Sequence, residues 1–141
     1  MVLDAADYRD ALARARDATG IGLSKQAWNL VGKIRELDAL VSPDLQPRVS
    51  EAHPESSFAE LAGAPLTTRK STPDGRDERT RLLLPSFPDV VEHLGRHLPI
   101  AVDVLDAFAT AWTARRMAVG TARWFGDDAL DARGLRMTVA V

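Results

Sequence analysis

Ser50-Glu51-Ala52-His53-Pro54-Glu55 is the stretch that decides how this sequence is interpreted. It follows a short run, around residues 48–52, in which the alternation of Val49 with polar neighbours predicts a strand. Pro54 then suits the first turn of a helix. A second acidic stretch, Asp103-Val104-Leu105-Asp106-Ala107, opens a longer helix. The sequence thus places carboxylates at the end of a strand and near the start of a late helix.

Most of the remaining chain has the pattern of helices. Apolar spacing, caps and prolines predict helices at about residues 4–18, 25–41, 56–61, 76–84, 89–98 and 101–119. Residues 64–76 are polar and turn-rich, which predicts an exposed loop. Alternation in residues 135–141 predicts a final strand. We therefore expect a mostly helical α/β fold, in one domain spanning residues 1–141, with about two short strands near 48–52 and 135–141.

Two strands alone rarely make a stable sheet. Either the helices supply the stability of the fold, or the sheet continues in material outside this sequence.

Composition excludes several classes of protein. The net charge is −2, so strong non-specific binding to a phosphate backbone is not implied, and any nucleic-acid contact must be local. The chain has no cysteine, which excludes disulfides and thiolate metal ligands. No apolar run is long enough to span a bilayer, and no secretory signal is visible, so we expect a cytoplasmic protein without a membrane partner.

The carboxylates of Asp103 and Asp106 share one helix face, because residues three apart are neighbours on a helix. Two adjacent like charges repel, and a bound cation removes that repulsion. A simpler explanation is that both acids occupy the first turns of a helix, where the helix dipole favours negative charge. The spacing alone favours this simpler explanation.

The strand end carries Glu51 and His53 on one side, because side chains alternate along a strand. A carboxylate beside an imidazole can bind a metal ion or run acid–base chemistry. The alternative is a solvent-facing strand end followed by ordinary first-turn residues, Pro54 and Glu55. These residues alone favour the alternative.

Basic residues flank the predicted loop. Lys70, Arg76 and Arg79 can meet phosphates, although such charges more often are solvated or pair with acids such as Asp77 and Glu78. Tryptophans at positions 28, 112 and 124 can stack on bases, but core packing suits the first two better.

Four stretches in order carry a resemblance to a known family. They are Gly22-Leu23-Ser24-Lys25-Gln26-Ala27-Trp28; Glu51-Ala52-His53-Pro54-Glu55; the segment from Lys70 through Gly75 to Arg79; and the segment from Asp103 to Arg116. In this order the chain resembles, from about Tyr8 to its end, a bacterial and archaeal family of predicted ribonuclease-H-like nucleases.

The resemblance implies a ribonuclease-H-like fold and hydrolysis of phosphodiesters with two Mg²⁺ or Mn²⁺ ions. It makes Glu51, Asp103 and Asp106 the catalytic carboxylates and metal ligands. His53, Glu55, Lys70 and Arg79 are candidate accessory residues.

The sequence departs from the family pattern at its start. Members of the family begin with strands, the first of which carries an Asp that bridges the metals, and Asp4 follows only two apolar residues. We therefore expect a C-terminal portion of such a domain, with little activity until an N-terminal segment completes it and an exposed edge on the strand of Glu51. The alternative is a non-catalytic interaction module, which pairs with itself or another protein through that edge or an apolar helix face.

Overall fold

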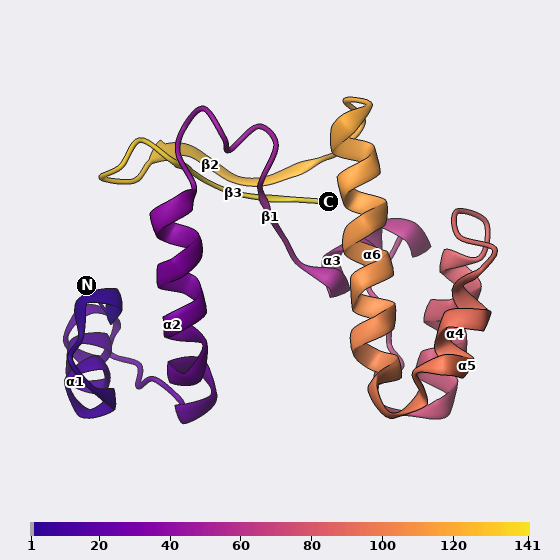
Figure 1. Ribbon diagram of the computed structural model, residues 1–141, viewed down its shortest axis with the longest axis horizontal. Helices are drawn as coiled ribbons and strands as arrows, with labels where there is room; N and C mark the ends of the chain where they lie inside the picture. Colours follow the sequence, from indigo (N-terminus) through magenta and orange to yellow (C-terminus); the bar gives the residue numbers. More distant parts are fainter. Residues whose placement is uncertain (1) are drawn as a thin grey trace. The chain divides into compact units, whose positions relative to one another are not determined.

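The computed structural model describes residues 2–141, apart from the side chain of Asp128. The chain divides into two compact units, one ending at Gln46 and one running from Pro47 to Val141. Their elements are labelled in Figure 1. The fold is mixed α/β and mostly helical, as the sequence predicts, and every candidate site residue lies in the second unit.

The first unit is a pair of helices after a short 3₁₀ turn, Val2–Asp4. Helix α1 (Tyr8–Thr19) begins where the Asp7 carboxylate accepts a hydrogen bond from the Asp10 N–H. Helix α2 (Lys25–Leu40) begins where the Ser24 hydroxyl accepts one from the Ala27 N–H. Such caps satisfy N–H groups that the first turn of a helix leaves unpaired.

Helix α2 exposes most of the apolar face that its sequence pattern predicts to be buried. Val31 is buried within the unit, whereas Leu30 and Leu37 remain more than half exposed.

The helices of the second unit gather around α6 (Ala101–Ala118). They are α3 (Pro54–Ala62), α4 (Pro73–Leu83) and α5 (Val90–Arg96), and a 3₁₀ turn at Leu98–Ile100 leads into α6. Figure 1 shows α4 and α5 alongside α6. Phe58, Leu83, Val90, Leu105 and Ala109 form the buried core between these helices.

A pair of buried hydroxyl groups lies within this helical packing. The hydroxyls of Ser57 on α3 and Thr113 on α6 are both fully buried and lie 2.8 Å apart. The Ser57 hydroxyl also donates to the His53 carbonyl. Buried polar groups need such partners, and this pair fixes how α3 and α6 face each other.

The sheet has three strands in the order β1-β3-β2: β1 (Glu51–Ala52), β2 (Trp124–Leu130) and β3 (Arg136–Ala140). β1 pairs with β3 in parallel, and β2 pairs with β3 in antiparallel orientation. Strands near 48–52 and 135–141 are confirmed, although β1 is shorter than its sequence pattern suggests. β2 was not predicted, because its glycine and acidic residues are typical of loops.

The backbone of β2 requires a glycine at position 126. Its φ is 119°, a region that side chains disfavour, and a Cβ there would lie 2.3 Å from the Met137 carbonyl oxygen. The register between β2 and β3 shifts just after this residue. The glycine thus permits an irregular strand where the sequence suggested none.

The turn between β2 and β3 depends on Asp131. Its carboxylate accepts hydrogen bonds from the N–H groups of Leu135 and Arg133, and these bonds hold the pKa of Asp131 below its ordinary value. Because the folded-state pKa is lowered, this contribution to stability is present above the ordinary pKa and is lost as the pH falls.

One boundary prediction was wrong. Pro73-Asp74-Gly75 was expected to close a loop, but it forms the first turn of α4. Pro73 suits this place because its missing N–H is not needed there, and the Thr72 hydroxyl accepts from the Gly75 N–H.

We predict that Phe58→Ala lowers the free energy of unfolding of the second unit by about 3–5 kcal/mol, because it leaves a cavity in a fully buried core. Leu98→Ala is the matched control, since Leu98 is 71% exposed, and it should change stability by less than about 0.5 kcal/mol. Urea denaturation followed by circular dichroism measures both. Equal effects would show that the helices do not share this core.

Candidate functional site

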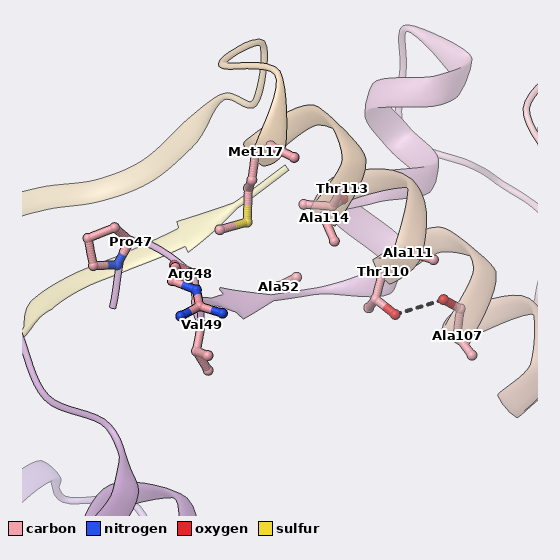
Figure 2. A pocket seen from close by; sticks show the side chains of 12 residues that line it. Pro47, Arg48, Val49, Ala52, Ala107, Thr110, Ala111, Thr113, Ala114 and Met117 are labelled. Atoms are coloured by element: carbon pink, nitrogen blue, oxygen red, sulfur yellow. Dashed lines mark hydrogen bonds between the residues drawn. The ribbon is translucent and has the colours of Figure 1, made fainter. Parts of the chain in front are cut away.

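A groove of about 810 Å³ lies between the β1 segment and α6. Figure 2 shows the two walls facing each other. Pro47, Arg48, Val49, Ser50 and Ala52 form the strand wall, and Ala107, Thr110, Ala111, Thr113, Ala114, Met117 and Ala118 form the helix wall. None of the described residues of β2 or β3 lines the groove, so it runs beside β1 and not across the sheet.

Apart from the buried Thr113, the helix wall is the face of α6 that the core does not use. Leu105 and Ala109 point into the core, whereas Ala107, Ala111 and Ala114 are exposed. The two faces alternate because a helix repeats every 3.6 residues. The spacing of these alanines is visible in the sequence and is the signal that could have indicated the groove.

Asp103 and Asp106 continue this wall toward the N-terminal end of α6. Asp103 precedes Ala107 by four residues, and Asp106 precedes Thr110 by four. Residues four apart lie on the same row of a helix. The acidic pair therefore stands on the groove side of α6, one turn beyond the groove itself.

Asp106 is the more constrained of the two acids. Its Oδ2 accepts a hydrogen bond from the Lys70 ammonium at 2.8 Å, while its Oδ1 is buried and has no partner among the described residues. A buried carboxylate oxygen without a donor or cation is costly. Asp103 is exposed in the first turn of the helix, as the helix dipole favours.

Glu51 lies on the other side of the strand. Ser50 and Ala52 line the groove and Glu51, between them, does not, because neighbouring side chains point to opposite faces. Glu51 is paired with Val139 and is exposed. Among the residues that the structure describes, no three His, Asp or Glu side chains come together in a group that could hold a metal ion.

The candidate accessory residues lie in different environments. The His53 Nδ1 lies 3.3 Å from the Ser56 hydroxyl at the start of α3. Arg79 is buried, and it donates to the Glu55 carboxylate at 2.7 Å and to the Gly75 carbonyl at 3.0 Å. Its guanidinium also lies 5.4 Å from the centre of the Phe58 ring. Arg79 and Glu55 thus join α4 to α3.

We predict that Glu55→Gln destabilises the second unit by about 1–3 kcal/mol, because it leaves the buried Arg79 without its anionic partner. Glu92→Gln is the control: it breaks an exposed ion pair with Arg96 and should cost less than about 1 kcal/mol. Thermal unfolding of both variants measures the difference. If the two variants unfold alike, the Arg79 pair does not stabilise the fold.

Comparisons with known proteins give one match. No curated protein and no solved structure matches this chain. No helix in the described part of the chain is both long and apolar enough to cross a membrane. A family model matches residues 1–130, which is most of the sequence, and the chain therefore belongs to the family described as "Protein of unknown function (DUF429)".

Proposed function

We propose that this chain supplies the acidic part of a metal-dependent phosphodiesterase of the ribonuclease-H-like type, working together with a further polypeptide segment. The observation that carries the proposal is the acidic pair on α6, in which Asp106 keeps one carboxylate oxygen unpaired beside a groove. The resemblance of the sequence to predicted nucleases adds the reaction class.

The donor set fits a hard divalent cation. Mg²⁺ prefers oxygen ligands, and proteins commonly hold it with one or two carboxylates, waters and phosphates of the substrate. Asp103 and Asp106 offer two carboxylates on one helix face. A bound Mg²⁺ or Mn²⁺ would supply activation of water and stabilisation of the leaving oxygen.

Lys70 has a positioning role in this proposal. Its ammonium holds the Oδ2 of Asp106 and so leaves Oδ1 for the cation. The Lys70 side chain is 44% exposed, which leaves it within reach of a phosphate of a bound nucleic acid.

The resemblance makes Glu51 a third ligand and His53 an accessory. The register of β1 favours Asp103 and Asp106 over Glu51, because Glu51 does not face the groove side. The proposal therefore assigns the larger part of metal binding to the α6 pair.

We predict that Asp106→Asn weakens Mn²⁺ binding by about tenfold or more, because it removes one of two anionic ligands. Titration calorimetry measures this, and magnesium- or manganese-dependent cleavage of branched and single-stranded DNA and RNA is measured alongside. Asp77→Asn, which removes an exposed acid on α4, is the matched control.

Glu51→Gln tests whether Glu51 is a third metal ligand. The register of β1 predicts that this substitution weakens Mn²⁺ binding less than Asp106→Asn does. Unchanged Mn²⁺ affinity in Asp106→Asn, or a loss of affinity equal to that of Asp77→Asn, would remove the metal site from this chain.

A second candidate function is a non-catalytic interaction module, and the sheet order favours it. β1 stands at one edge of the sheet and has β3 as its one strand neighbour within the described chain. Exposed strand edges readily pair with other chains. Sedimentation with and without Mg²⁺ separates the two functions, since association that ignores Mg²⁺ supports the module, and a monomer whose Mn²⁺ affinity depends on Asp106 supports the metal site.

A further inference from the structure

We infer that the groove receives one extended segment of another polypeptide, which pairs with the free edge of β1, turns small apolar side chains toward α6 and places a carboxylate against Arg48. This inference rests on the second function proposed above and specifies its partner.

The strand wall calls for an extended backbone. β1 uses one edge to pair with β3, and the groove is lined by the β1 segment without any described residue of β3. Because Ser50 and Ala52 direct their side chains into the groove, it lies over one face of β1, and it extends toward the edge that β3 does not use. An added strand can satisfy the backbone groups of such an edge, whereas a helix cannot.

The helix wall calls for small apolar side chains. Ala107, Ala111 and Ala114 present only methyl groups to the groove. The two threonine hydroxyls of this wall are already engaged, since Thr110 donates to the Ala107 carbonyl at 2.9 Å and Thr113 pairs with Ser57. Figure 2 shows the Thr110 bond running along α6 and not into the groove. Every second side chain of an added strand would meet this apolar wall.

The charge of Arg48 predicts one polar side chain of the incoming segment. Arg48 lines the groove, is exposed, and its side chain forms no ion pair or hydrogen bond with the rest of the described chain. Glu60 pairs with Arg116 and Arg123, and Glu55 pairs with Arg79, so these acids are already engaged. A carboxylate on the incoming segment is the natural partner for Arg48.

A second copy of this chain is a weaker occupant. Pairing two β1 strands edge to edge would rest on Glu51 and Ala52 from each copy. Isolated two-stranded pairings are marginal even when they are longer. A segment that also fills the groove buries apolar surface in addition to forming backbone bonds.

Short capped peptides that alternate valine and threonine test the inference. One pair carries aspartate at either end, and a matched pair carries lysine instead. Binding is followed by amide chemical shifts of the full chain in solution. We expect shifts at Ala52, Ala107 and Ala111, and about three- to tenfold tighter binding of the aspartate peptides than of the lysine peptides.

Arg48→Glu is the decisive variant, because Arg48 makes no internal contact that folding needs. It should reverse the preference, so that the lysine peptides bind more tightly. Ala111→Trp should fill the groove and abolish peptide binding, whereas Ala62→Trp, an exposed position on α3 outside the groove, should not.

The inference is overturned if no peptide shifts the groove amides, if Arg48→Glu leaves the order of affinities unchanged, or if the chain is a dimer whose interface covers the groove. Its failure is separate from that of the proposed functions. Mn²⁺ binding tests the acidic pair without any peptide, and association through another face would keep the interaction module while removing this partner.

Discussion

The two-sided character of α6 is the constraint on which the second unit depends. One side carries Leu105, Ala109 and Thr113 into the packing with α3, α4 and α5, and the buried hydroxyl pair fixes the facing of α3 and α6. Because these packing residues occupy one side of α6, the packing determines which residues lie on its other side. That other side is an alanine wall that ends in two carboxylates, next to a strand edge.

This arrangement brings together features that are far apart in the sequence. Residues 47–52 and residues 103–118 meet across one groove, and the loop before α4 brings Lys70 to Asp106. The groove is apolar, its strand edge is polar, and its end is acidic. Such a combination suits a site that is completed by another segment, because apolar surface and an open edge favour association while the acids favour a cation.

The sequence predicted much of the helical framework and the strands β1 and β3, but not β2. The bounds of α2 follow from the Ser24 cap and apolar spacing, and those of α6 from apolar spacing after Pro99; these signals act locally, so the sequence pattern contains them. β2 depends on pairing with β3 and on the positive φ of Gly126, which no local pattern reveals. Pro73 was ambiguous because proline suits both a turn and a first helical turn, and the Thr72 cap decides between them.

The candidate site was predicted in part. Helical spacing places Asp103 and Asp106 on one face, and the structure does so as well. The grouping of Glu51 with the two aspartates rests on resemblance. The alternation of side chains along β1 directs Glu51 away from the groove. Glu55 and Arg79, candidate accessory residues by resemblance, form an interhelical ion pair, and the Arg79 guanidinium lies against the Phe58 ring. The groove itself depends on which face of α6 the core occupies, and this becomes known only when the helices are packed.

Paramagnetic broadening of backbone amides by Mn²⁺ tests the central claim most directly, since it locates the ion on the folded chain. The account predicts that substoichiometric Mn²⁺ broadens the amides of Asp103, Asp106 and Ala107 most strongly, and broadens those of β2 and of the far end of α6 little. Broadening centred on another acidic surface, such as the start of α4, or no selective broadening at all, would contradict it.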